Sequence, residues 1–307
     1  MTVRIIDDPP APGTEAWRKM ITASKIPAIM GASPWESPYS IAVSMQEDYE
    51  PPVVSDSKAD LFLYGHSIEY ALAHFWGQKN HDWDVSEGEV AFTNDTLPFA
   101  NLVTTDRVAT HKETGEKALL EFKSVSNFDA LKKWGKPGTP NSVPLNYRLQ
   151  VLSQMGVSGI HTAYVVMASI GVPEVHEVKW NAMEWLAILK HCTAFTRTIE
   201  AGNLPDLDDH TATYEAVRGQ HPDIDEGSVV VVEWDQANEL AEAKEALTAA
   251  KARETEAKTK MLATLGNAQK AVCNGVVVAR RQKGRNGNPE MRVPTGIRQQ
   301  LTEGAAE

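Results

Sequence analysis

The chain has 307 residues, of which 42% are hydrophobic and 23% are charged, a composition typical of a folded protein. This length predicts about two domains, or one domain with a large appendage. No apolar run approaches the roughly 18 residues that a membrane span needs, and the start of the chain has no apolar signal stretch. We therefore expect a cytoplasmic protein without a membrane association. Since Cys192 and Cys273 are the two cysteines, a four-cysteine zinc or iron–sulfur site is excluded.

The net charge of −11, from 30 basic and 41 acidic residues, argues against a surface that binds nucleic acid everywhere. It permits a local basic groove and a cluster of carboxylates that binds a metal. The basic residues concentrate near the end of the chain, at Arg280, Arg281, Lys283, Arg285, Arg292 and Arg298. This segment fits either a flexible tail or a set of phosphate contacts.

The first two thirds of the chain mix helix and strand patterns. Turn signals alternate with short apolar runs over residues 92–125, which favours a pair of strands. The best-defined strands are predicted over residues 117–124, 161–168 and 175–180. Apolar residues at helical spacing predict helices over 144–156 and 182–201, and Gly202 is a suitable stop for the second.

An acidic stretch over residues 205–227 separates this region from the rest. Its aspartates at 206, 208 and 209 could suggest a calcium loop, but the glycine and glutamate spacing of an EF-hand does not follow. A solvated connector is the favoured interpretation. We therefore divide the chain into a core of residues 1–204, an acidic connector of 205–227 and a C-terminal unit of 228–307.

The C-terminal unit is predicted to combine one long helix with a hairpin and a basic tail. Residues 229–233 are β-branched, and residues 235–265 contain no Gly or Pro, which predicts a helix of about 45 Å. Glu254 interrupts its heptad pattern, so packing within its own domain is favoured over a coiled coil. Asn274-Gly275 between two apolar runs predicts a type I′ hairpin.

The candidate active site begins with Asp106 and continues 15 residues later with Glu121-Phe122-Lys123. This pattern is typical of metal-dependent nucleases. On a strand, residues i and i+2 face the same side, so Glu121 and Lys123 would project into one pocket. Two carboxylates and the backbone oxygen of Phe122 would form an all-oxygen site for Mg²⁺ or Mn²⁺. Lys123 would place a cation near the attacking water and the phosphate.

Glu-x-Lys alone is a weak signal, because the chain contains four copies of it. The copies at Glu242 and Glu256 fall on the predicted long helix, where residues i and i+2 do not face each other. The copy at Glu177 and Lys179 is a rival on a predicted strand, although no aspartate lies a hairpin's distance before it. An ion pair on an edge strand remains the alternative interpretation of Glu121 and Lys123.

Five segments in order make the nuclease interpretation more specific. They are ITASKIPAIMGASPWESPYSIAVS, YGHSIEYALAHFW, TTDRV, LLEFKS and LNYRLQVLSQMGVSG. Over roughly residues 15–180, this arrangement resembles the YqaJ-like viral recombinases, the phage lambda exonuclease family of the PD-(D/E)XK superfamily. The resemblance implies a restriction-endonuclease-like α/β core, with a mixed central sheet flanked by helices, in addition to the C-terminal helix and hairpin.

The resemblance also implies catalytic roles. Asp106 and Glu121 match the metal-binding carboxylates, and Lys123 matches the catalytic lysine. Glu69 matches a helical acid that supports the metal directly or through water, with a solvated helix acid as the alternative. Gln150 matches a glutamine that orients water or the lysine, with an ordinary exposed glutamine as the alternative.

Further residues are implied to contact the DNA phosphate. Ser24 matches a hydroxyl near the terminal phosphate, although it could also cap a helix that begins near Ile26. Thr104 supplies a second hydroxyl, and Tyr147 would line the cleft. Arg18 lies close to a phosphate-binding arginine of the family, with a register that differs by one residue. The nine histidines show no metal-ligand spacing and are assigned no function.

The expected activity is a Mg²⁺-dependent deoxyribonuclease that hydrolyses phosphodiester bonds, acting as an exonuclease on double-stranded DNA ends in phage-type recombination. The resemblance implies 5′ to 3′ polarity, a homotrimer, a single-strand annealing partner and a phage or prophage origin in the host cytoplasm. One alternative is a non-catalytic DNA-binding or assembly module that keeps the nuclease fold. Another is a Cas4-type or helicase-associated nuclease, which the low cysteine count disfavours.

Overall fold

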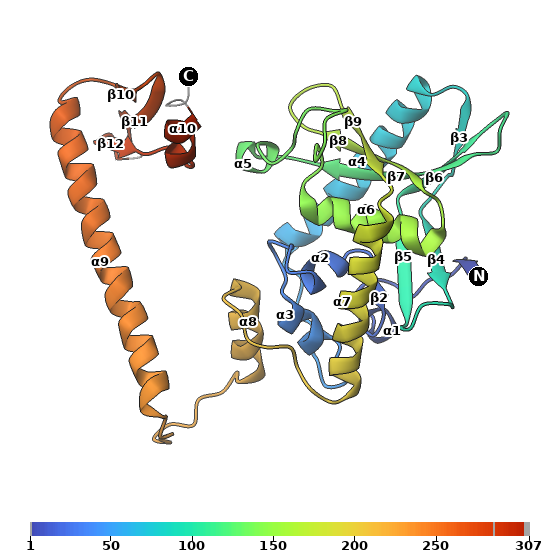
Figure 1. Cartoon of the computed structure of the whole chain (residues 1–307), viewed down its shortest axis with the longest axis horizontal. Coiled ribbons are helices and arrows are strands. Elements are labelled where there is room, and N and C mark those ends of the chain that lie inside the picture. The colour runs from blue at the N-terminus through green and yellow to red at the C-terminus, as the bar shows by residue number, and fades with distance from the viewer. Residues whose placement is uncertain (1, 285, 304–307) are drawn as a thin grey trace. The chain divides into compact units, whose positions relative to one another are not determined.

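The computed structural model describes residues 2–284 and 286–303 and has a mixed α/β architecture (Figure 1). The chain divides into two units, Met1–Ile224 and Asp225–Glu307. Among the described helices, none combines the length and apolar character that crossing a membrane would require.

A five-stranded mixed sheet forms the centre of the first unit, in the order β3-β6-β7-β8-β9. Its strands are β3 (Trp83–Val85), β6 (Arg107–His111), β7 (Lys117–Ser124), β8 (Thr162–Ala168) and β9 (Glu174–Lys179). The pair β7–β8 is parallel and the other pairs are antiparallel. The predicted strands over 117–124, 161–168 and 175–180 are confirmed, with small shifts at their ends.

Helices cover both faces of β7. Leu119 packs into the cluster that contains Leu149 of α6 (Leu145–Ser158), whereas Leu120 packs with Leu72 of α4 (Asp56–Lys79). Because side chains alternate along a strand, Glu121 shares the α6 face of β7 with Leu119. The apolar sequence of β7 therefore follows from burial on both faces.

A second, four-stranded sheet has the order β1-β4-β5-β2. Its strands are β1 (Val3–Ile6), β2 (Ile21–Thr22), β4 (Val90–Asn94) and β5 (Asn101–Thr105). β5 leads through Asp106 directly into β6, so Asp106 lies where the chain passes from the four-stranded to the five-stranded sheet.

The remaining helices of the first unit are α1 (Glu15–Arg18), α2 (Ile26–Ile29), α3 (Pro38–Ser44), α5 (Phe128–Leu131), α7 (Ala182–Glu200) and α8 (Thr211–Gln220). The predicted helix over 182–201 is α7, and Gly202 follows it with a φ of +74°. Gly156 on α6 lets α7 approach closely, because a Cβ at this position would lie 2.4 Å from the ring of Trp185.

The acidic stretch 205–227 differs from the solvated connector that its composition predicts. It contains helix α8, which packs on α3. The buried Thr213 hydroxyl donates to Ser37 Oγ at 2.7 Å, and the Tyr39 hydroxyl donates to Gln220 Oε1 at 3.1 Å. These hydrogen bonds hold α8 of the acidic stretch against α3, a contact that a count of charges does not predict.

The second unit contains α9 (Trp234–Leu265), a sheet in the order β10-β11-β12, and α10 (Ile297–Glu303). Its strands are β10 (Lys270–Cys273), β11 (Val276–Lys283) and β12 (Pro289–Arg292). The long helix and the hairpin are confirmed. Asn274 and Gly275 both have positive φ, as a type I′ turn requires. The β-branched residues 229–233 form no strand and are exposed.

Candidate active site

Strand β7 presents Glu121 and Lys123 on the same face, toward α6. Glu121 is only 2% exposed, and Lys123 Nζ donates to Glu121 Oε1. A buried carboxylate costs free energy unless charges and hydrogen bonds compensate it. Lys123 supplies one such partner.

Two glutamines of α6 donate further hydrogen bonds to the Glu121 carboxylate. Gln150 Nε2 donates to Oε1 and Gln154 Nε2 donates to Oε2, both at 2.7 Å. Gln154 Nε2 also donates to the backbone oxygen of Thr104 at 2.8 Å. Both carboxylate oxygens are thus held in fixed directions. The sequence pattern did not single out Gln154, although its i+4 spacing from Gln150 on one helix could have indicated it.

Asp106 lies between β5 and β6, and its Oδ2 accepts the backbone N–H of Phe122. Burial and the neighbouring charge of Glu121 raise the pKa of Asp106 well above its usual range, against the opposing effect of Lys123. Asp106 and Glu121 therefore form a pair of carboxylates that repel each other. A divalent cation between them would relieve this repulsion.

Lys123 carries its charge toward these carboxylates. Burial lowers its pKa, but the attraction of Glu121 and Asp106 outweighs burial and raises the pKa above the ordinary value. Its Nζ also lies 5.4 Å from the centroid of the Tyr147 ring, within the range of a cation–π contact. Lys123 is consequently protonated at neutral pH and acts in this site as a cation.

A pocket of about 210 Å³ joins the predicted phosphate-contacting and metal-binding residues. Five predicted site residues line it, namely Ser24, Thr104, Asp106, Glu121 and Gln150. Trp17, Glu89 and the proline-rich residues 9–12 form further parts of its wall. Ser24 does not cap α2, because Lys25 occupies the N-cap position there. The Ser24 side chain is exposed and lies 3.1 Å from the Thr22 hydroxyl.

Arg18 does not join this group. Its guanidinium donates to the backbone oxygens of Ser44 at 3.0 Å and Gly13 at 3.4 Å, and it lies over the ring of Tyr49. These contacts direct the side chain to the end of α3. The predicted phosphate contact of Arg18 therefore receives no support from the structure.

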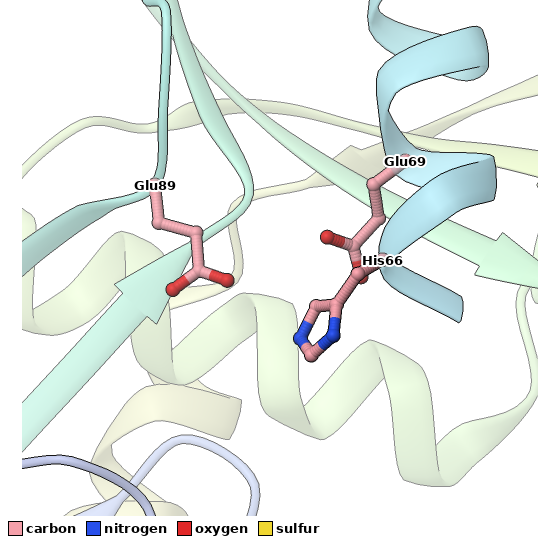
Figure 2. Close-up of side chains that lie close together, drawn as sticks. All are labelled: His66, Glu69 and Glu89. Atoms are coloured by element: carbon pink, nitrogen blue, oxygen red, sulfur yellow. The ribbon is translucent and has the colours of Figure 1, made fainter. Parts of the chain in front are cut away.

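Glu69 lies in a second group of metal-ligand side chains, with His66 and Glu89 (Figure 2). His66 and Glu69 project from α4, and Glu89 precedes β4. Their ligand atoms all lie within 4.8 Å of one another. Burial raises the pKa of Glu69, His66 opposes this effect and Glu89 adds to it. The sequence alone assigned no function to His66 or Glu89. The i, i+3 spacing of His66 and Glu69 was a local signal, whereas Glu89 is brought in by the fold.

Lys25 supports the wall of the pocket. It is 2% exposed, and its Nζ donates to the backbone oxygens of Trp17, Arg18 and Met20 at 3.1, 2.6 and 2.8 Å. Its Nζ also lies 4.4 Å from the centroid of the Trp17 ring. Burial lowers the pKa of Lys25 to about 8. This lysine, which follows Ser24, ties the end of α1 and Met20 to the start of α2.

The donor set suits a small divalent cation. Carboxylates of Asp106 and Glu121 face one pocket, and Glu69 lies close enough to add to the pKa rise of Asp106. Lys123 is the one cation that lowers the pKa of Asp106 against the effect of these carboxylates. Oxygen-rich sites with excess negative charge favour Mg²⁺ and Mn²⁺. The rival pair Glu177 and Lys179 lies exposed on β9 and has no such surroundings.

The fold and site thus define a mixed α/β domain with an acidic pocket and an embedded lysine. The family model of the YqaJ-like viral recombinase domain matches residues 14–161, a range that includes Asp106, Glu121 and Lys123. Over this range the chain is similar to the YqaJ-like viral recombinase domain.

Solved structures with detectable similarity include SSO0001, at 10% identity and a TM-score of 0.36, covering 58% of this chain and 76% of that one. An alkaline exonuclease from Laribacter hongkongensis, LHK-Exo, is 15% identical with a TM-score of 0.46, covering 68% of this chain and 97% of that one. Its complex with dAMP gives 14% identity, with the same TM-score and coverage. No curated protein matches the chain.

Proposed function

We propose that the protein is a Mg²⁺-dependent deoxyribonuclease that degrades double-stranded DNA from its ends in the 5′ to 3′ direction. One observation carries the proposal. Glu121 and Lys123 share one face of β7, and the Asp106 carboxylate bonds to the backbone amide between them. This arrangement places Lys123 beside two carboxylates that line one pocket, Glu121 on the same strand and Asp106 between β5 and β6, a composition that suits a nuclease site.

Asp106, Glu121 and the backbone oxygen of Phe122 would hold the metal, and Glu69 would support it. Bound Mg²⁺ supplies a water of lowered pKa and neutralises charge on the phosphate. Gln150 and Gln154 keep the Glu121 carboxylate oriented through one hydrogen bond to each oxygen. Lys123 remains protonated and stabilises negative charge that develops on the phosphate during hydrolysis.

Ser24 and Thr104 line the same pocket and would contact the terminal phosphate through their hydroxyl groups. We infer from this that a 5′-phosphorylated end is degraded faster than a 5′-hydroxyl end. Ser24→Ala should reduce the difference between the two ends, while Gln150→Ala should slow the degradation of both equally. Equal rates on both ends with the unaltered protein would remove the phosphate pocket from the proposal and leave the metal site untouched.

The test of the proposed reaction uses duplex DNA labelled at either the 5′ or the 3′ terminus. Incubation with Mg²⁺ or Mn²⁺ should release short labelled products from the 5′-labelled strand first, and EDTA should abolish their release. Ca²⁺ should bind but support little turnover, because its looser coordination positions water poorly. Robust cleavage in EDTA would contradict the metal mechanism, and early release from the 3′ label would reverse the polarity.

The family resemblance also favours a homotrimer and a single-strand annealing partner, and we include both in the proposal. Sedimentation of the purified protein measures the first, and co-purification with a single-strand annealing protein measures the second. A non-catalytic DNA-binding module is the competing function. It predicts DNA binding without products under every metal condition.

A further inference from the structure

A row of three basic residues crosses the sheet of the second unit. Lys270 on β10 lies opposite Arg280 on β11, and Arg280 lies opposite Arg292 on β12. Side chains at directly opposed positions point to the same face of a sheet. All three residues are exposed. We refer to Lys270, Arg280 and Arg292 as the cation row.

Without a bound anion, the cation row destabilises the folded protein. Like charges directly opposite each other destabilise a strand pair. Within the described chain, none of the three forms an ion pair, whereas Lys258 and Lys260 on α9 each pair with a glutamate one turn away. Glu290 is the one acidic residue of the three described strands, and it lies opposite the neutral Gln282. An anion from outside would relieve the repulsion.

The other face of this sheet serves for packing. Ala279 is fully buried, and Ala271 and Met291 are half-buried. These residues alternate with the cation row along the three strands. Val278, two residues before Arg280 on β11 and thus on the face of the row, is also buried, so the part of this face that carries the exposed row is the part available to a partner.

The local charge also differs from that of the chain. Residues 266–307 contain seven Lys or Arg against three Asp or Glu, whereas residues 1–265 contain 23 against 38. The basic concentration predicted from the sequence contributes two members to the row, Arg280 and Arg292. Lys270 joins them through strand pairing, and Arg285 lies outside the described residues. Arg281 instead donates to the backbone oxygen of Gly266.

We propose that the cation row binds the phosphate backbone of duplex DNA, as a binding surface on a different unit from Glu121. Strands lie about 4.8 Å apart, so the row spans about 10 Å. This length corresponds to about three rises of roughly 3.4 Å along one strand, that is, to a stretch of about four successive phosphates. Lys and Arg contacts of this kind position DNA without reading its sequence. The choice of DNA as the partner rests on the proposed nuclease function.

The experiment compares two triple variants of the full chain. K270Q/R280Q/R292Q removes the row, and K244Q/K251Q/R253Q removes three exposed basic residues from α9 in the same unit. Both variants change the net charge equally. Binding is measured on covalently closed circular duplex DNA in EDTA over a range of salt concentrations, so that neither DNA ends nor hydrolysis contribute. Circular dichroism verifies that both variants fold.

Removal of the row should weaken binding at least about tenfold near 0.1 M salt. It should also make the plot of log affinity against log salt shallower by about one for each phosphate that the variant no longer neutralises. The α9 variant should bind as the unaltered chain does. Equal binding by all three proteins, or equally weakened binding by both variants, would overturn the proposal.

A further variant, D106N/E121Q, separates this surface from the active site. It should lose cleavage of linear duplex in Mg²⁺ but keep full binding to circular DNA. If the chain proves not to be a nuclease, the binding comparison in EDTA still decides the role of the cation row.

Discussion

The tripeptide pattern Glu-x-Lys occurs in both units of the molecule with different structural outcomes. On β7, Glu121 and Lys123 face the same side and bond to each other in a buried site. On α9, Glu256 bonds to Lys260, and Lys258 bonds to Glu254, all of them exposed. The strand period of two joins residues i and i+2, whereas the helix period joins residues i and i+4. Identical letters thus form a buried ion pair in one unit and surface ion pairs in the other.

The two copies also differ in their environment. Glu121 accepts hydrogen bonds from two elements, from Lys123 of β7 itself and from Gln150 and Gln154 of α6, which packs against β7. α9 buries only Leu265 among its described residues. Tertiary packing converts a charged pair into a site with fixed directions, and an exposed helix leaves the same pair free to exchange partners with water.

The largest expected effect breaks the pair on β7. Lys123→Ala or Glu121→Ala should reduce the nuclease rate by about 1000-fold or more, because each removes a charge that acts on the reacting phosphate or its metal. The rate is measured on linear duplex DNA in Mg²⁺, with folding checked by circular dichroism.

Two control variants use the other copies of the pattern. E177A/K179A on β9 and E256A/K258A on α9 change exposed side chains and should cleave at the normal rate. If the β9 variant were inactive and Lys123→Ala active, the wrong strand would have been assigned to the site.

Local patterns predicted much of the fold. Strand β7 has the bounds that its apolar run indicates, and the hairpin forms at Asn274-Gly275 because both residues tolerate positive φ. α8 was not predicted, since its stability depends on contacts with α3 far away in the sequence. The β-branched residues 229–232 form no strand, because such residues form a strand only where a partner strand is available.

The site could be predicted in part for the same reason. Spacing identified Glu121 and Lys123 because they share one strand, and family resemblance added Gln150 and Ser24. The role of Glu89 could not be predicted, because no local pattern connects the segment before β4 with α4. Arg18 had a suitable residue type, but its hydrogen bonds to backbone oxygens commit it elsewhere. Side-chain direction is a product of packing, which a sequence pattern does not specify.

The next effect concerns metal affinity. It compares the group of His66, Glu69 and Glu89 with exposed acids on α9. H66N/E89Q should weaken Mn²⁺ binding by about tenfold or more if the group around Glu69 supports the metal site, as outer ligands commonly do. Mn²⁺ binding is followed by electron paramagnetic resonance without DNA. The control E254Q/E256Q removes two exposed acids of α9 and should bind Mn²⁺ normally. Equal affinities in all the proteins would exclude the group from metal binding.

A third effect contrasts tight packing with open space around two helical glycines. Gly156→Ala places a Cβ within 2.4 to 2.6 Å of the Trp185 ring, so it should lower the free energy of unfolding by about 1–3 kcal/mol. Gly219→Ala on α8 meets open space and should be neutral or stabilising by up to about 1 kcal/mol. Urea denaturation followed by tryptophan fluorescence measures both. A Gly156→Ala protein as stable as the original would show that α6 and α7 are not closely packed.

The smallest effect concerns the pH dependence of stability in the absence of metal. Burial and Glu121 raise the pKa of Asp106 in the folded protein above the value of about 3.9 for an unfolded chain. Between these two values the folded state binds more protons than the unfolded state, so this group makes the free energy of unfolding fall as pH rises. Asp106→Asn removes the titration, and the variant should therefore gain stability relative to the original as pH rises through this window.

The comparison uses thermal denaturation from acidic to neutral pH in EDTA, followed by a repeat with Mg²⁺. Mg²⁺ should reverse the order of Asp106→Asn and the original at neutral pH, because a cation stabilises the ionised pair that is destabilising without it. Parallel curves for Asp106→Asn in EDTA would mean that Asp106 and Glu121 do not repel each other in the folded protein, and would remove the electrostatic reason for placing a metal between them.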